Sequence, residues 1–91
     1  MVITDTAKQA LLELFDRYDN DNVRIYFAGQ GDGTPDLGLG IDPPEENDIV
    51  WEINSIKVAI DPQILFVAEN ITLDVQDTPD GRGVVITSNT H

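Results

Sequence analysis

The chain has 91 residues and no cysteine. This absence excludes disulfides, thiolate metal ligands and cysteine nucleophiles. Cations are also scarce, because five Lys and Arg stand against seventeen Asp and Glu, for a formal net charge of -12. Such a field repels phosphate backbones and anionic membrane surfaces. We therefore expect neither nucleic acid nor a membrane as a partner.

Long apolar runs are absent as well, and histidine is nearly so. No stretch approaches the ~20 apolar residues that a membrane-spanning helix needs. The first residues show no basic segment followed by an apolar one, so we expect no secretory signal and a cytoplasmic location. The single histidine is His91, the last residue, which leaves no internal base for a Ser-His-Asp hydrolase. We expect no catalytic residues and no enzymatic activity.

The pattern of apolar residues predicts one amphipathic helix near the start of the chain. Over residues 5–18 the apolar side chains recur at helical spacing on one face, namely at Ala7, Leu11, Leu14, Phe15 and Tyr18. Thr4 precedes them and is a favourable N-cap. The DNDN segment at 19–22 predicts a turn that ends the helix.

Most of the remaining chain alternates apolar with polar or small side chains, as half-buried strands do. Strands are predicted over 23–28, 37–42, 49–54, 56–60, 71–75 and 84–86, with turns at 43–48, 54–55 and 77–83 and a frayed tail at 87–91. Asp61 and Pro62 predict the start of a short helix over 62–69. Residues 1–91 thus form a single α+β domain. We expect mostly antiparallel or mixed curved sheets, sandwich-like, with an N-terminal amphipathic helix and a short second helix.

The candidate site is the Gly-rich turn between the first two predicted strands. Its residues are Gly29, Gln30, Gly31, Asp32, Gly33 and Asp36. Backbone N–H groups of such a turn can surround an anion, and Asp32 with Asp36 offers hard oxygen ligands for a cation. The alternative is turn chemistry alone, with glycines at positive φ and an Asp that bonds its own backbone.

Acidic side chains elsewhere do not follow the spacing of a calcium loop. They cluster at Asp42, Glu45, Glu46, Asp48 and at Asp77, Asp80. We interpret both clusters as solvated acidic surface. Tyr26 and Trp51 stand at strand spacing, where core packing is the common role of aromatic side chains, although a partner surface is an alternative.

Several short segments, in this order and spacing, resemble one known family. They are Ile3-Thr4 with Ala7, Val23-Arg24-Ile25 before the Gly-rich turn, Asp48-Ile49-Val50, Ile56-Lys57-Val58 with Asp61, Thr72-Leu73-Asp74, and Gly83-Val84-Val85-Ile86 with Asn89. Across nearly the whole chain they resemble the A-type iron–sulfur carriers, the HesB-like domains. The turn is closer to a HesB-like subgroup that often carries cysteine or selenocysteine there.

The resemblance implies a HesB-like fold and common ancestry with carriers of iron–sulfur clusters. Members that hold a cluster have a cysteine in this turn and a Cys-Gly-Cys near the C-terminus, whereas here the turn position falls on Gly31 or Asp32. We therefore expect no cofactor, no metal site, and a role as a binding or regulatory module. Its partner would be an unidentified protein or a second copy in a homodimer. The alternative is an iron or iron–sulfur carrier that uses Asp32 or external thiols such as glutathione.

Overall fold

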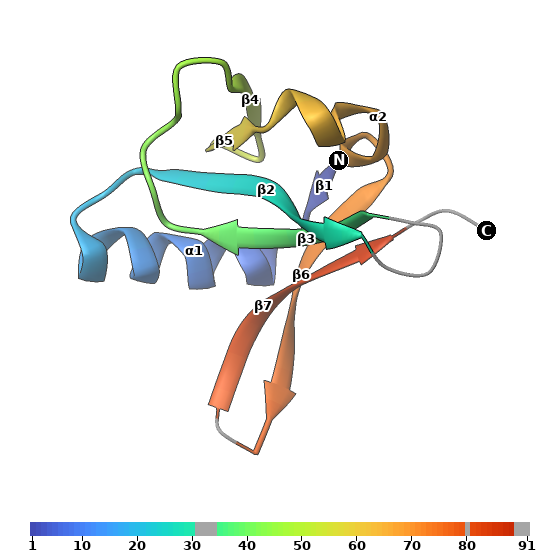
Figure 1. Cartoon of the computed structure of the whole chain (residues 1–91). Coiled ribbons are helices and arrows are strands. Elements are labelled where there is room, and N and C mark those ends of the chain that lie inside the picture. Colours follow the sequence, from blue (N-terminus) through green and yellow to red (C-terminus); the bar gives the residue numbers. More distant parts are fainter. Residues whose placement is uncertain (31–34, 80, 89–91) are drawn as a thin grey trace.

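The structure is a computed structural model that describes residues 1–30, 35–79 and 81–88 (Figure 1). Its elements, in chain order, are β1 Val2–Ile3, α1 Asp5–Tyr18, β2 Asn22–Gln30, β3 Pro35–Gly40, β4 Ile49–Ile53, β5 Ile56–Ile60, the 3₁₀ helix η1 Pro62–Ile64, α2 Leu65–Ala68, β6 Ile71–Thr78 and β7 Gly81–Ser88.

The strands form two sheets. One has the order β3-β2-β5-β4 and the other the order β1-β6-β7. The pairs β2–β5 and β1–β6 are parallel, and the other neighbours are antiparallel. Helix α1 runs beside both sheets, and α2 lies at the far end of the molecule (Figure 1). The predicted α+β class, with mixed sheets, an N-terminal helix and a short second helix, is confirmed.

Helix α1 begins and ends where the local signals predict. The Ala7 N–H donates to the Thr4 hydroxyl at 3.1 Å, which satisfies one orphan donor of the first turn. Asp19 takes a left-handed conformation with φ of 52° and closes the helix. Tyr18 was predicted on the apolar face, and this was wrong, because it is the last residue of α1 and is 60% exposed.

The core lies between the two sheets and α1. It is built from aliphatic side chains that α1, β1, β2, β5, η1, α2 and β6 contribute: Ile3, Ala7, Leu11, Val23, Ile25, Ile56, Val58, Ile60, Ile64, Ala68, Ile71 and Leu73. The half-buried Trp51 packs against this cluster. The core packing predicted for this side chain is confirmed. Burial of this kind is the main favourable term in folding.

One predicted turn and one predicted helix start are confirmed. Asn54 and Ser55 both have positive φ, 52° and 66°, as the two-residue turn between β4 and β5 requires. Asp61 caps η1, because its carboxylate accepts from the Gln63 N–H at 3.0 Å and Pro62 follows it. These local features explain why a hairpin and a short helix follow one another here.

Several boundaries differ from prediction. Strand β2 extends to Gln30, so Gly29 and Gln30 lie in a strand rather than in the predicted turn. Asn22 begins β2 rather than ending a turn, because it pairs with Lys57 of β5. Its buried side-chain amide also donates to the Asp42 carbonyl, at 2.8 Å. Strand β3 stops at Gly40, short of the predicted 42. The β6–β7 ladder continues to Thr78 and Gly81 and, at its other end, to Ser88, so the predicted turn at 77–83 and the frayed tail at 87–88 are wrong. The positive φ of Gly81, 121°, lets β7 start directly after the turn. Residues 89–91 lie outside the described residues.

Candidate functional site

The predicted site lies at the free end of the β2–β3 hairpin. The ladder register shifts between Phe27 and Gly29, which marks a bulge. Gly29 has φ of 137°, a conformation that only glycine adopts readily. It pairs with the exposed Asp36, and Gln30 pairs with Pro35.

Three of the six predicted site residues are therefore placed together, namely Gly29, Gln30 and Asp36. Gly31, Asp32 and Gly33 lie outside the described residues. A ligand role for the set stays a prediction.

The bare face of β3 is covered by one aromatic ring. Tyr26 stands opposite Gly38 across the β2–β3 ladder. A Cβ placed on Gly38 would collide with the Tyr26 ring, so this glycine allows close approach of a side chain. The Arg24 guanidinium carbon lies 5.7 Å from the centroid of the same ring, within the range of a cation–π contact.

Arg24 and Asp48 form an ion pair that the sequence analysis missed. Arg24 Nε donates to Asp48 Oδ2 at 2.6 Å, and Arg24 Nη2 donates to Asp48 Oδ1 at 3.1 Å. The Glu45 N–H also donates to Asp48 Oδ2, at 2.9 Å. The Asp48 side chain is only 2% exposed and that of Arg24 is 14% exposed. The pair fastens the segment before β4 to the outer face of β2.

This environment favours the charged form of both groups. The hydrogen bond from Arg24 lowers the pKa of Asp48 against the opposing effect of burial, and the Glu45 N–H adds to the lowering. The hydrogen bond to Asp48 likewise raises the pKa of Arg24. Asp48 was interpreted as solvated surface, and this was wrong. The available signal was Arg24 itself, a lone cation at strand spacing followed by an acidic segment.

The other predicted acidic residues that the structure describes do not converge. Glu45 reaches Arg24 at 3.4 Å, but its side chain is 73% exposed, and Asp77 pairs with Arg82 at 3.1 Å on the exposed β6–β7 hairpin. Within residues 1–30, 35–79 and 81–88, no three His, Asp or Glu side chains gather as a metal site. No helix in these ranges is long and apolar enough to cross a membrane.

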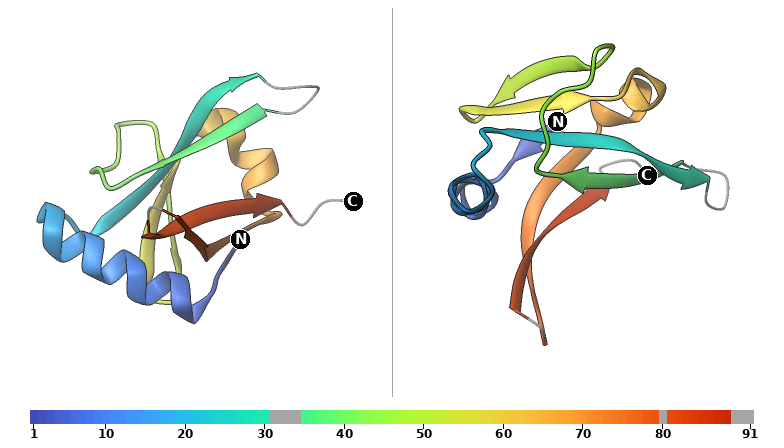
Figure 2. Two further views of the ribbon diagram at one scale, coloured as in Figure 1. Left: turned by 90° about the horizontal axis from the view of Figure 1, so that it is seen from below. Right: turned by 60° about the vertical axis from the view of Figure 1, so that its left-hand side comes forward.

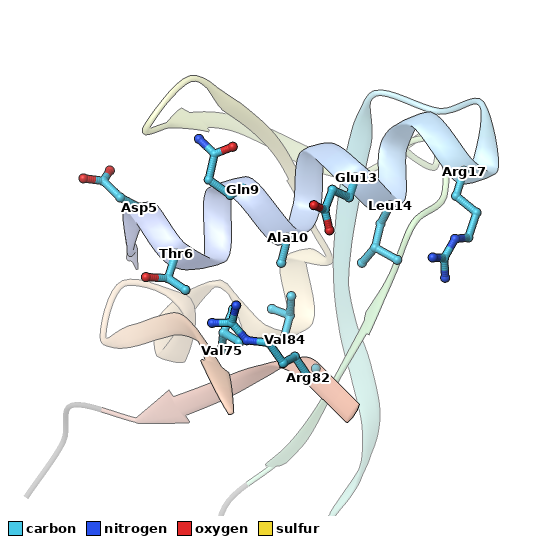
Figure 3. Close-up of a pocket in the computed structure, with 11 residues that line it drawn as sticks. Asp5, Thr6, Gln9, Ala10, Glu13, Leu14, Arg17, Val75, Arg82 and Val84 are labelled. Atoms are coloured by element: carbon cyan, nitrogen blue, oxygen red, sulfur yellow. The ribbon is translucent and has the colours of Figure 1, made fainter. Parts of the chain in front are cut away.

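A groove of about 510 Å³ separates α1 from the β6–β7 hairpin (Figure 3). Its apolar lining includes Ala10, Leu14, Val75 and Val84. Charged residues of both signs surround this lining, namely Asp5, Glu13, Arg17 and Arg82, so the groove selects no ligand by charge. The sequence could not predict it, because it depends on how the hairpin packs beside the helix.

Comparison with known proteins gives matches of structure only. No family model matches the chain, and no curated protein matches it. The crystal structure of IscA with the [2Fe-2S] cluster superposes with a TM-score of 0.78 and 16% identity, over 96% of this chain and 83% of that one. The chain has an IscA-like fold. The solution NMR structure of a protein from Aquifex aeolicus also matches, with a TM-score of 0.63 and 25% identity, over 94% of this chain and 88% of that one.

The donor groups of this IscA-like chain do not fit an iron–sulfur cluster. Such clusters are held chiefly by cysteine thiolates, and the sequence has none. The described carboxylate at the β2–β3 end is that of Asp36, a hard oxygen ligand that suits calcium or magnesium better than cluster iron. The IscA-like fold is therefore present without the usual means of holding a cluster.

Proposed function

We propose that this chain is a non-catalytic binding or regulatory module related to the iron–sulfur assembly carriers, and that it holds no cluster with its own side chains. One observation carries the proposal, which is an IscA-like fold over 96% of a chain that has no cysteine. Thiolates are the ligands that clusters require in most proteins. We infer that an IscA-like fold without thiolate ligands acts by binding other molecules at its surface.

The titratable groups support a role without catalysis. Catalytic acids and bases usually have perturbed pKa values and stand free to meet a substrate. Among the described residues, the resolved shifts belong to Arg24 and Asp48. These two satisfy each other and favour their charged states, so neither is poised to exchange a proton near neutral pH.

The partner we propose is a protein, or a second copy of this chain, that contacts the β2–β3 end. Asp36 is exposed there beside Gly29. The net charge of -12 favours basic partners over nucleic acid or anionic membranes. We place this role in the cytoplasm as part of the same proposal.

A carrier role with other ligands is the second candidate. The exposed position of Asp36 favours it, because an accessible carboxylate can take a metal ion together with Asp32 or with an external thiol such as glutathione. Under this reading, the protein would bind iron weakly and transiently.

Anaerobic addition of ferrous iron and sulfide, with and without glutathione, separates the two roles. We expect the protein to show no visible cluster band in either condition. A stable band that disappears in Asp32→Asn or Asp36→Asn would refute the binding-module proposal and support the carrier role. Asp77→Asn is the matched control, since its carboxylate is also exposed but lies on the β6–β7 hairpin.

Affinity capture tests the proposed binding end. The wild type, Asp36→Ala and Asp77→Ala are used as baits with the same cell extract. We expect a specific partner that is retained by Asp77→Ala and lost by Asp36→Ala. A partner retained equally by all three baits would show that the β2–β3 end is not the interface.

A further inference from the structure

Strand β4 is one open edge of the four-stranded sheet. The order β3-β2-β5-β4 gives β4 a neighbour on one side only. In the right-hand view of Figure 2, β4 runs along the outer border of the molecule, next to β5 and away from β3. An open edge presents backbone groups to which a further strand can bond.

The register shows which residues of β4 offer those groups. Ile53 and Ile56 close the two-residue turn and exchange both hydrogen bonds. Bonded pairs alternate along an antiparallel ladder, so Trp51 and Ile49 also bond β5. The N–H and C=O of Val50 and Glu52 then point to the open edge. Within the described ranges, these groups form no backbone hydrogen bond with a segment outside β4 and β5.

Strand β4 is short and carries one charged side chain, Glu52, but it lacks the other usual protections of a sheet edge. Natural edges carry Lys, Pro or a bulge that discourages pairing. Strand β4 has the sequence IVWEI, its register with β5 is uninterrupted, and Val50 and Ile49 are 50% and 37% exposed. The opposite edge, β3, carries Pro35 and two glycines, so it is a poorer template.

The charge around β4 indicates what kind of strand it would accept. Glu45 and Glu46 are exposed just before it, and the exposed Glu52 lies on it, opposite the exposed Lys57 of β5. Arg24, on β2, already forms an ion pair with Asp48. A second copy of the chain would bring the same acidic residues and another net charge of -12. The surface is therefore complementary to a basic segment and disfavours self-pairing.

We propose that β4 accepts an extended, basic segment of a partner protein as a fifth strand of the sheet. Backbone bonds to Val50 and Glu52 give affinity, as in other cases of strand addition. Because side chains alternate between faces, apolar residues of the segment cover Ile49 and Trp51, and its Lys or Arg side chains meet Glu52. This surface lies apart from the β2–β3 end and goes beyond the function proposed above.

The test uses the full chain and the capped peptide Lys-Val-Lys-Val-Lys-Val-Lys, at near-physiological salt to suppress diffuse attraction. Amide NMR shifts are followed during titration, with the peptide Glu-Val-Glu-Val-Glu-Val-Glu as the reversed-charge control. We expect saturable shifts centred on Val50 and Glu52 with the basic peptide alone. Shifts centred on the α1–β7 groove, or no saturable binding, would overturn the proposal.

Two variants check the mode of binding. Val50→Pro removes an edge N–H that the β4–β5 ladder does not use, and we expect affinity to fall at least about tenfold. Arg82→Pro removes the corresponding edge N–H of β7, and we expect no change. Glu52→Lys keeps the backbone and should weaken the basic peptide by about tenfold while allowing the acidic one to bind.

Equal binding by Val50→Pro would mean that the peptide is held without strand addition and would refute the proposal, whether or not Glu52→Lys weakens binding. Shifts at Val50 that grow with protein concentration, in the absence of peptide, would instead identify a second copy as the occupant and refute the basic partner.

Discussion

Asp48→Asn tests whether the Arg24–Asp48 pair stabilises the fold as its burial implies. The change keeps the shape of the side chain but removes its charge and turns one acceptor into a donor. Two hydrogen bonds from Arg24, at 2.6 and 3.1 Å, and one from the Glu45 N–H depend on the carboxylate. The guanidinium, 14% exposed, would be left facing an amide.

The expected loss follows from that burial. Breaking one side of a buried ion pair costs about 3 kcal/mol, because the remaining charge stays largely desolvated; here Arg24 would keep only the exposed Glu45, 3.4 Å away, as a charged partner. An exposed pair would cost at most about 1 kcal/mol. A domain of this length has a free energy of unfolding of roughly 5–13 kcal/mol. We therefore expect Asp48→Asn to lose about a third of it, with the midpoint of thermal unfolding lowered by about 12–24 °C.

Urea unfolding followed by Trp51 fluorescence is the assay. Trp51 is the only tryptophan and is half-buried against the core, so its emission reports unfolding. A loss below about 1 kcal/mol would refute the reasoning, since the pair would then behave like an exposed one. The double variant Arg24→Met with Asp48→Leu is the control. Replacing both charges by apolar side chains should cost far less than Asp48→Asn.

Three further predictions follow from local geometry. The pKa of Asp48 is lowered in the folded state, so its contribution is complete above about pH 4, the unfolded value, and is lost as pH falls through the folded pKa. Urea midpoints of wild type and Asp48→Asn should therefore converge in acid, and a constant difference would contradict this. Ser55→Gly should raise the free energy of unfolding by about 1 kcal/mol, because Ser55 has φ of 66° in the β4–β5 turn; an unchanged thermal midpoint would count against it. Gly29→Ala should cost about 1–3 kcal/mol through its φ of 137°, whereas Gly83→Ala, with open space and no positive φ, should change thermal stability little.

Short-range signals predicted much of the fold. Thr4 and Asp61 satisfy N–H groups within three residues of themselves, and Asn54-Ser55 sets a two-residue turn. Each of these features depends on a neighbour in sequence, so propensity and capping rules suffice to find it. Boundaries failed where a distant partner decides the outcome. Asn22 belongs to β2 because it pairs with Lys57, which lies on β5, a strand distant in the sequence.

The site was predicted less well, for the same physical reason. Arg24 and Asp48 are separated by a whole strand and a loop, and parallel pairing of β2 with β5 depends on the complete topology. No periodicity encodes which carboxylate an arginine will reach. The positive φ predicted for Gly29 is confirmed, but Gly29 lies in β2 and pairs with Asp36, so its place in a turn was wrong. Composition does not tell a bulge from a ligand site.

The core explains how an IscA-like fold exists here without cysteine. The fully buried residues of β2 are Val23 and Ile25, which precede the bulge, and β3 contributes only half-buried side chains such as Leu37 and Leu39. The described end of the β2–β3 hairpin therefore supplies little of the burial that stabilises the domain. Chemistry at that end and stability of the fold are separable, so likeness of fold carries no information about cluster binding. The iron and sulfide titration addresses the first, and unfolding of Asp48→Asn addresses the second.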